Sequence, residues 1–472
     1  MSDPISPEPA DDTFAALPLS PRLLANLRQL EYFRMTPIQA ASLPLALAGH
    51  DLIAQAKTGS GKTAAFALPL LTRLNPRHFA VQAMVLCPTR ELAEQVTQEI
   101  RRLARYEDNI KVMTLCGGTT MRPQLASLER GAHIIVGTPG RILDHLQRGS
   151  LNLEAVNTLV LDEADRMLEM GFYDDIAYVA MQCPDKRQTL LFSATFPEGI
   201  ARLAQHFLRE PREVKLLEQH AGSKIRQRFY EIRHEDRLQA VATLLRHYRP
   251  VSTLAFCNTK QQCRDLLEVL HAHQFEALTL NGDLEQRERD QVLIRFANRS
   301  CSVLVATDVA ARGLDIDRLE AVINVDVTPD PEIHIHRIGR TGRADEAGWA
   351  LSLCSSIDKR RVATIALSMG SEPEWHDLNA LTIDNPLPLV PPMVTLQILG
   401  GRKEKIRPGD VLGALTGEAG FAREQVGKIT VTDQSTYVAV VRDIAREAVQ
   451  KLSVGKIKGK TVKVRALEDR SA

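Results

Sequence analysis

The sequence lacks the features that mark secreted or membrane proteins. Its seven cysteines form no Cys-x-x-Cys pair, and most of them lie in apolar runs, so neither a disulfide framework nor a zinc site is indicated. No apolar run approaches the roughly 18 residues that cross a membrane. The N-terminal MSDPISPEPADD has neither the basic start nor the apolar core of a signal peptide. We therefore expect a cytoplasmic protein with no membrane partner.

Net charge is also nearly absent, since 59 Lys and Arg face 58 Asp and Glu. The distribution is uneven. Residues 393–472 hold 15 basic residues against 9 acidic ones, whereas the rest of the chain holds 44 against 49. The positive charge is concentrated in the last segment, and that segment is the candidate for contact with a polyanion.

The length of 472 residues predicts about three domains. Short apolar runs alternate with helical stretches, as in parallel sheets that are buried on both faces. The rhythm restarts near Phe229, and single cores stop growing beyond about 250–300 residues, so two α/β domains are expected at 13–215 and 216–370. A disordered N-terminus (1–12) precedes them, and the linker between them is predicted near 211–223. The predicted strands are Asp51–Ala54, Ala83–Leu86, Ile134–Val136, Thr158–Leu161 and Thr189–Phe192, then Ser252–Phe256, Ala277–Leu280, Ser302–Ala306, Ala321–Asn324 and Ala350–Leu353.

A proline-rich stretch, 371–392, is predicted to be a linker because it shows little periodicity. The remaining segment, 393–472, is predicted to be a small α+β domain with the order β-α-β-β-α-β. This is the ferredoxin-like arrangement that RNA-recognition modules also use. Its predicted elements are Val394–Leu399, Gly409–Gly417, Gly427–Val431, Tyr437–Val441, Arg442–Leu452 and Thr461–Arg465.

A glycine-rich turn follows the first predicted strand and precedes an apolar helical stretch. In such a loop the backbone N–H groups surround a phosphate, and the helix N-terminus adds its positive end. Lys62 is predicted to reach the β- and γ-phosphates of ATP, and the Thr63 hydroxyl to bind Mg²⁺. The alternative, a chance Gly/Ser turn, fits poorly with the strand–loop–helix context. The residues of the turn are Ala56, Lys57, Thr58, Gly59, Ser60, Gly61, Lys62 and Thr63.

A second strand, Thr158–Leu161, ends in an acidic tetrapeptide. A carboxylate in this position holds Mg²⁺ in P-loop ATPases, so Asp162 is predicted to be the metal-site residue, acting through water. Glu163 is placed to position or deprotonate the attacking water. The alternative is an acidic helix N-terminus that is favoured by the helix dipole. Both interpretations hold for Asp165, for which no metal role is predicted.

With these two sites in place, residues 12–370 resemble the DEAD-box RNA helicases, which implies two tandem RecA-like domains. The resemblance implies that Gln39 reads the edge of the adenine base and that the Tyr32 ring covers the face of this base. Segments of the first domain resemble the family's RNA-contacting motifs, and Ser193-Ala194-Thr195 resembles the motif that couples hydrolysis to strand separation. The RNA-contacting segments contain Pro88, Thr89, Arg90, Gly117, Gly118, Thr138 and Arg141.

The second domain continues the resemblance. Phe256–Thr259 and the segment with Gln286 and Arg289 resemble RNA-side motifs. The segment from Ala306 to Asp315 resembles the one that contacts RNA through residues such as Thr307 and the ATP ribose through Asp315. His336–Arg343 resembles the arginine-finger motif, which implies coupling by His336 and catalysis by Arg340 and Arg343. Fingers on a different domain from Lys62 reach the phosphate only when the domains close, and bound RNA would favour closure.

In the tail, the stretches that match a known domain are Arg407–Gly417, Val426–Ile429 and Gly455–Lys460. Through them the tail resembles, over its whole length, the RNA-binding domain that one bacterial branch of this family carries. The resemblance implies a hairpin in large-subunit (23S) ribosomal RNA as target, and the large-subunit precursor as partner in ribosome assembly. Tyr437 is the single aromatic residue of the predicted central strand, so base stacking on the sheet is not expected. Phosphate contacts are expected instead, with a solubilising basic face as the alternative. The basic residues are Lys403, Lys405, Arg407, Lys428, Lys456, Lys458 and Lys460.

The sequence thus predicts a monomeric, ATP- and Mg²⁺-dependent RNA helicase that opens short duplexes locally. A DNA-unwinding P-loop motor is one rival, which the segment with Gln39 and the Asp162–Asp165 tetrapeptide argue against. An ATP-gated RNA clamp is another, since the same residues serve clamping and unwinding. An inactive relative fits poorly, because every phosphate-site residue is present.

Overall fold

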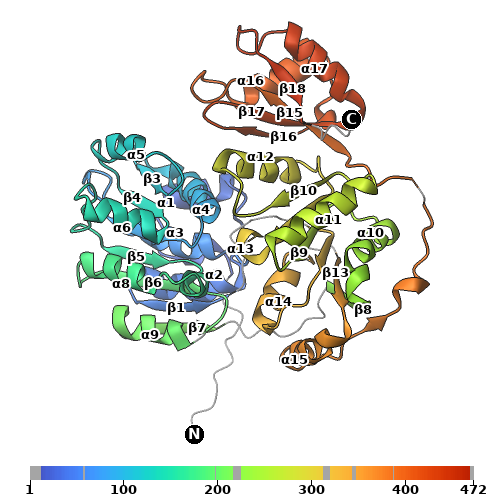
Figure 1. Ribbon diagram of the computed structural model, residues 1–472. Coiled ribbons are helices and arrows are strands. Elements are labelled where there is room, and N and C mark those ends of the chain that lie inside the picture. The colour runs from blue at the N-terminus through green and yellow to red at the C-terminus, as the bar shows by residue number, and fades with distance from the viewer. Residues whose placement is uncertain are drawn as a thin grey trace. The chain divides into compact units, whose positions relative to one another are not determined.

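The computed structural model describes residues 12–56, 59–196, 198–215, 225–311, 319–342, 347–385 and 387–467. The chain divides into two compact units. One consists mainly of the first α/β domain, and the other contains the second α/β domain and the tail (Figure 1). The predicted turn residues Lys57 and Thr58, the ribose ligand Asp315 and the finger Arg343 lie outside the described residues.

The first domain is built on a parallel sheet of seven strands in the order β3-β4-β2-β5-β6-β1-β7. Every strand predicted here is present within a residue or two. Two more were not predicted, β3 and the edge strand β7. The predicted linker 211–223 is wrong at its start, because β7 pairs with β1 there, and the exposed polar residues of β7 hide the strand pattern. The strands are β1 Leu52–Gln55, β2 Ala83–Leu86, β3 Val112–Leu115, β4 Ile134–Gly137, β5 Thr158–Leu161, β6 Gln188–Ser193 and β7 Arg212–Lys215.

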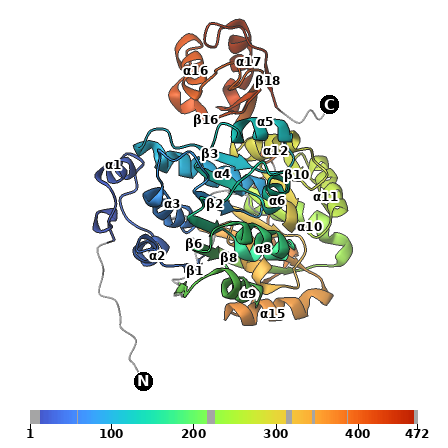
Figure 2. The ribbon, with the colours of Figure 1, turned by 90° about the vertical axis from the view of Figure 1, so that its left-hand side faces the viewer.

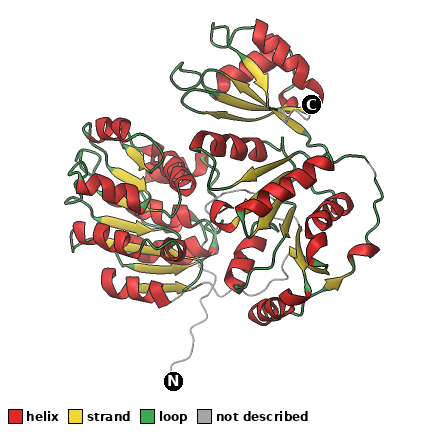
Figure 3. Ribbon diagram, in the orientation of Figure 1, coloured by secondary structure: helices red, strands yellow, loops and turns green. Residues whose placement is uncertain are grey.

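Helices cover both faces of this sheet (Figure 3). Successive strand residues supply opposite cores: Leu52 and Ala54 pack with α1 to α4, whereas Ile53 packs with α6 to α9. Burial on both faces explains why these strands are continuous apolar runs. α3 and α4 lie side by side (Figure 2). The helices are α1 Pro21–Gln29, α2 Pro37–Leu47, α3 Lys62–Arg73, α4 Arg90–Leu103, α5 Met121–Leu128, α6 Pro139–Gln147, α7 Ala164–Glu169, α8 Tyr173–Gln182 and α9 Glu198–Phe207.

The second domain repeats the design with the strand order β10-β11-β9-β12-β13-β8-β14, again parallel. The strands are β8 Ile225–Glu231, β9 Thr253–Cys257, β10 Ala277–Leu280, β11 Val303–Thr307, β12 Ala321–Asn324, β13 Gly348–Cys354 and β14 Trp375–His376. The helices are α10 Arg237–Tyr248, α11 Lys260–Ala272, α12 Gln286–Ala297, α13 Asp308–Ala311, α14 Pro331–Ile338 and α15 Lys359–Met369. Two RecA-like α/β domains are thereby confirmed.

Strand β14 lies inside the stretch 371–392, which was predicted to be a plain linker. The Phe229 backbone N–H donates to the Glu374 carbonyl at 2.9 Å, and the rings of Phe229 and Trp375 lie 5.8 Å apart. A strand of two residues is too short to show periodicity, so the sequence pattern could not reveal it. The first part of this stretch therefore completes the second sheet.

The tail forms an antiparallel four-stranded sheet in the order β16-β17-β15-β18. The predicted β-α-β-β-α-β order is confirmed. One core, which includes Val394, Leu396 and Val438, lies between this sheet and the two helices. The elements are β15 Met393–Ile398, α16 Pro408–Gly413, β16 Val426–Val431, β17 Thr436–Val441, α17 Ala445–Val454 and β18 Val464–Ala466.

Among the residues that the structure describes, no helix combines the length and the apolar character that crossing a membrane requires.

Candidate nucleotide and RNA sites

The predicted phosphate loop lies between β1 and α3. Gly59 and Gly61 have φ values of 80° and 93°, which glycine adopts without strain. Lys62 begins α3 with its side chain buried, and its Nζ donates to the Ala56 carbonyl at 3.0 Å. The strand, the left-handed turn and the helix N-terminus thus follow each other as the sequence predicts, with the cationic side chain folded back over the loop.

Gln39 contacts this loop from α2. Its Nε2 donates to the Gly61 carbonyl at 3.0 Å, and its Oε1 accepts from the Thr36 backbone N–H at 2.9 Å. Tyr32 points elsewhere: its hydroxyl donates to Glu99 at 2.6 Å and its ring meets Phe14 edge-on. Burial, followed by the Glu99 contact, raises the pKa of Tyr32, so this phenol is neutral. The structure therefore ties Gln39, but not Tyr32, directly to the phosphate loop.

Asp162 follows β5 and is only 2% exposed. Its Oδ1 is buried and has no hydrogen-bond partner. Burial raises the pKa of Asp162 to about 7, with the Lys62 charge opposing this rise and Glu163 adding to it. The buried Oδ1 of Asp162 has no hydrogen-bond partner, and Lys62 is the cation that lies near it. Such an oxygen is suited to bind a cation and its water shell, so Asp162 fits a Mg²⁺ site.

Glu163 and Asp165 have different surroundings. Glu163 has a φ of 52°, a strained value for a non-glycine residue, and pairs with Arg166 at 2.9 Å. Asp165 accepts from the Ala194 N–H at 3.0 Å and from the Thr195 N–H and hydroxyl at 2.9 and 3.0 Å. Ser193 donates to the Thr195 carbonyl at 2.6 Å. Asp165 thus joins the acidic segment to the Ser193–Thr195 segment, a role the sequence did not reveal.

The predicted RNA segments of the first domain meet at the carboxyl ends of β2, β3 and β4. The Arg90 guanidinium lies against Gly117 and Gly118, so close that a side chain at Gly118 would overlap it. Arg141 donates to the Thr119 carbonyl at 3.1 Å. Pro88 and Thr89 directly precede Arg90, and the Thr89 hydroxyl caps α4. Thr138 stands just before α6, which carries Arg141.

Gln124 on α5 links these segments and was not predicted. Its Nε2 donates to the Cys116 carbonyl and the Thr119 hydroxyl at 3.1 and 2.9 Å, and its Oε1 accepts from Arg141 at 3.0 Å. The buried His145 lies 2.9 Å from the same oxygen. Nothing in the local pattern around Gln124 marks it, because two of its partners, Arg141 and His145, lie 17 and 21 residues away in the sequence.

The second domain also brings its predicted RNA segments together. Arg289 on α12 donates to the Ala310 carbonyl at 2.8 Å, which places it beside the segment that begins at Thr307. The Thr307 hydroxyl accepts from the Ala310 N–H at 3.4 Å. Gln286 starts the same helix as Arg289 and contacts Asp290 at 2.9 Å. Thr259 caps α11 through its hydroxyl.

The predicted arginine-finger segment, His336–Arg343, begins on the last turn of α14. Arg337 is almost completely buried and makes two hydrogen bonds to Asp308, at 2.6 and 2.7 Å. His336 lies beside it on the last turn of the helix, and Arg340 is 5% exposed just beyond the helix end. Arg337 therefore stabilises the second domain, whereas Arg340 lies on the turn after the helix.

Basic side chains of the tail gather on two adjacent loops. Lys458 donates to the Lys405 carbonyl at 2.6 Å, which joins the loop after β15 to the loop before β18. Six of the predicted basic residues are exposed on these loops, namely Lys403, Lys405, Arg407, Lys456, Lys458 and Lys460. Lys428 is exposed on the edge strand β16 instead.

Tyr437 is unsuited to base stacking in this structure. It is 4% exposed, and its hydroxyl accepts from Gln397 Nε2 at 3.3 Å. The expectation from the sequence, that the sheet does not stack bases, agrees with this burial.

Comparisons with known proteins identify the class. The pattern of the DEAD/DEAH box helicases matches residues 36–203, that of the helicase conserved C-terminal domain matches 236–345, and that of the DbpA RNA binding domain matches 395–466. Yeast (S. cerevisiae) Dbp5 bound to RNA and ADP BeF3 superposes with a TM-score of 0.71 at 31% identity, over 78% of this chain and 96% of that one. The chain belongs to the DEAD-box family of ATP-dependent RNA helicases, and it is an ATP-hydrolysing enzyme.

Within that class the chain is similar to two bacterial helicases. The ATP-dependent RNA helicase DbpA of Escherichia coli K12 is 51% identical over 450 residues, which cover 95% of this chain and 98% of the relative. The helicase CshA of Geobacillus kaustophilus is 43% identical over 72% of this chain and 73% of its own length. The chain is thus similar to DbpA from end to end, tail included.

Proposed function

We propose that this helicase opens short RNA duplexes locally, and that its tail directs it to a hairpin of 23S ribosomal RNA during assembly of the large ribosomal subunit. The observation that carries the proposal is the presence, on one chain, of a phosphate loop beside Asp162 and of a basic tail of DbpA type. We further propose that it acts as a monomer in the cytoplasm and does not act on DNA.

The proposed ATP site uses Lys62 for the β- and γ-phosphates and the loop Ala56 to Thr63 for backbone contacts. Gln39, already bonded to this loop, would read the adenine edge, with Tyr32 over the adenine face after it leaves Glu99. Asp162 and Thr63 would hold Mg²⁺, which neutralises charge on the phosphates when bound. Glu163 would position the attacking water. Asp315, outside the described residues, would bind the ribose.

The second domain would contribute arginine fingers. An arginine at the transferring phosphate accelerates P-loop hydrolysis by about 10³–10⁵. We propose this role for Arg340 and Arg343, which act when RNA favours closure of the two RecA-like domains. Ser193, Thr195 and His336 would couple hydrolysis to the bound strand. The strand itself would be held by Arg90, Gly117, Gly118 and Arg141 in the first domain, and by Gln286, Arg289 and Thr307 in the second.

The tail would determine which RNA the helicase acts on, and this is what we call its address role. The proposal is supported by the six predicted basic side chains on two loops that a hydrogen bond joins, which places these side chains close enough together to contact phosphates of one RNA. To test this, the ATPase stimulation by 23S ribosomal RNA is compared with that by a random RNA of equal length, with and without residues 393–472. We expect selectivity only in the full chain. Equal selectivity in both forms would refute the address role.

An ATP-gated RNA clamp remains the second candidate, because the contacts that bend a strand also hold it. A strand-displacement assay on a short duplex distinguishes the two functions. Release above an ATP-free control supports unwinding, and no release favours the clamp. Stimulation by single-stranded DNA equal to that by RNA would instead indicate a DNA motor.

A further inference from the structure

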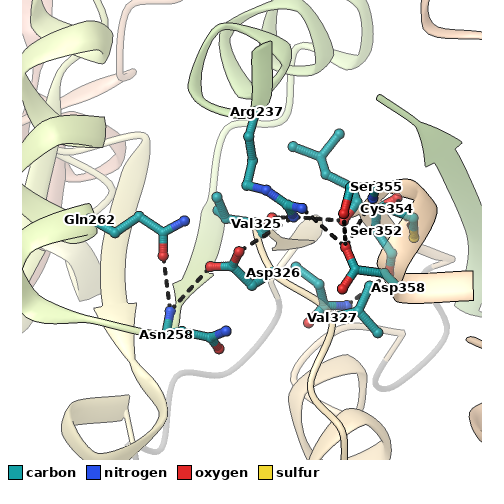
Figure 4. A network of polar contacts seen from close by, with 12 residues as sticks. Arg237, Asn258, Gln262, Val325, Asp326, Val327, Ser352, Cys354, Ser355 and Asp358 are labelled. Carbon is teal, nitrogen blue, oxygen red and sulfur yellow. Dashed lines mark hydrogen bonds and ion pairs between the residues drawn. The ribbon is translucent and has the colours of Figure 1, made fainter. Parts of the chain in front are cut away.

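A buried polar network lies at the carboxyl ends of β9, β12 and β13 in the second domain (Figure 4). Asp326 is at its centre, just beyond the end of β12. Because β12 lies between β9 and β13 in the sheet, Asp326 is placed between the turn that follows each of them. The turn after β9 contains Asn258 and Thr259, which belong to a segment proposed to face RNA.

Asp326 makes three contacts. Its Oδ2 accepts from the Asn258 backbone N–H at 3.3 Å, and its Oδ1 lies 3.4 Å from the Arg237 guanidinium. Its main-chain carbonyl accepts from Arg337 at 2.7 Å. The side chains of Asp326 and Arg237 are 14% and 5% exposed, so water competes little for this ion pair, whereas the hydrogen bond from Asn258 is exposed to solvent. One residue therefore touches the RNA-side turn and the arginine-finger helix α14 together.

Arg237 holds the Asp326 carboxylate in place. Its guanidinium donates to the carbonyls of Val325 and Leu353 at 2.5 and 3.0 Å and pairs with Asp358 at 3.1 Å. Asp358 also accepts from the Ser355 N–H and hydroxyl at 2.9 and 2.8 Å (Figure 4). Because four groups hold the Arg237 guanidinium, it moves little. We expect a displacement of the Asn258 turn to move the Asp326 backbone rather than Arg237.

Arg337 connects Asp326 to α13 and to the proposed arginine-finger segment. Its two hydrogen bonds to Asp308 fix the start of α13, and its third N–H group meets the Asp326 carbonyl. Arg337 follows His336 directly and precedes Arg340 by one helical turn. A change in the position of the Asp326 backbone therefore reaches the end of α14 through the Arg337 side chain, which is almost completely buried.

We propose that Asp326 is a positioning residue that links RNA contact at the Asn258 turn to the placement of Arg340. RNA bound at this turn would fix Asn258, its N–H would fix Asp326, and Arg337 would hold α14 where Arg340 meets the phosphate. The proposal rests on the proposed roles of Arg340 and of the Asn258 segment. The competing explanation is that Asp326 only stabilises the domain.

The test is Asp326→Asn in the full-length protein. An amide offers one accepting oxygen, so the variant keeps the Asn258 bond or the Arg237 contact, but not both. With saturating RNA we expect the ATPase kcat to fall about tenfold, within the range for coupling residues, while the KM for ATP and the rate without RNA stay within about twofold. The loss should appear in kcat, because RNA still binds the remaining contacts.

Two variants serve as controls. Asp358→Asn keeps one accepting oxygen for Arg237 and Ser355, loses the negative charge and does not touch the Asn258 turn, so it should lower the unfolding temperature but keep the RNA stimulation. Gln262→Leu removes the second acceptor of the Asn258 N–H, at 3.1 Å, and should raise the KM for RNA while preserving kcat.

The proposal is overturned if Asp326→Asn keeps its RNA-stimulated kcat, or if Asp358→Asn loses as much. Unfolding of Asp326→Asn at assay temperature, seen by circular dichroism, would also overturn it in favour of a stabilising role. Failure of the proposed function looks different, because then the unmodified protein itself shows no stimulation of ATP hydrolysis by RNA.

Discussion

The phosphate loop contains a position where one methyl group should abolish much of the ATP affinity. Gly61 has a φ of 93°, and a Cβ built there would lie 2.6 Å from Gln39 Nε2 and 2.9 Å from the Thr36 hydroxyl. In Gly61→Ala the loop must leave its left-handed conformation or displace Gln39. Either change disturbs the backbone that is proposed to surround the phosphates.

The cost follows from two contributions. A non-glycine residue in the left-handed region costs about 1–2 kcal/mol. Loss of the hydrogen bond from Gln39 to the Gly61 carbonyl costs a further ~1 kcal/mol. If the nucleotide-bound loop requires the same backbone, the dissociation constant for ATP should rise by about 30- to 100-fold, which corresponds to roughly 2–3 kcal/mol.

The assay is titration with a fluorescent ATP analogue, accompanied by thermal unfolding. Gly149→Ala is the matched control, because Gly149 has a φ of 66° and no atom within 4 Å of its added Cβ. It should lower stability by about 1 kcal/mol through backbone strain alone and leave ATP affinity unchanged. The reasoning is refuted if Gly61→Ala binds ATP within twofold of the unmodified protein, or if Gly149→Ala weakens binding equally.

Three further predictions concern Lys62, Glu163 and His334. Lys62→Ala should lower ATP hydrolysis by at least about 100-fold, yet leave binding of the tail to RNA intact in a filter-binding assay. Glu163→Gln should slow hydrolysis while retaining ATP-dependent RNA binding, and rapid turnover would contradict the role of Glu163. Burial lowers the pKa of His334 to about 4. The unfolded chain therefore binds more protons than the fold below pH 6.5, and the second domain should lose about 2 kcal/mol between pH 7.5 and 5. Urea unfolding should show a smaller loss in His334→Gln.

The class of fold was predicted correctly from the sequence, and so was the succession of strand, glycine turn and helix at the proposed ATP site. Strands buried on both faces are continuous apolar runs, and a phosphate loop needs its glycines and lysine in one short segment. Both features are local, so they can be read without tertiary contacts. The same holds for the tail, whose alternation of strands and helices predicted its sheet and its two helices.

Contacts between segments far apart in the chain could not be predicted from the sequence. The sequence predicts a metal role for Asp162 and none for Asp165, but it does not show which groups Asp165 contacts. The fold gives Asp165 three donors from the turn after β6, whereas it leaves a buried oxygen of Asp162 without a partner. The roles of Gln124 and Asp326 likewise depend on partners at the ends of neighbouring strands. Parallel strands bring distant loops to one edge of the sheet, and a sequence pattern records the strands but not which loops they bring together.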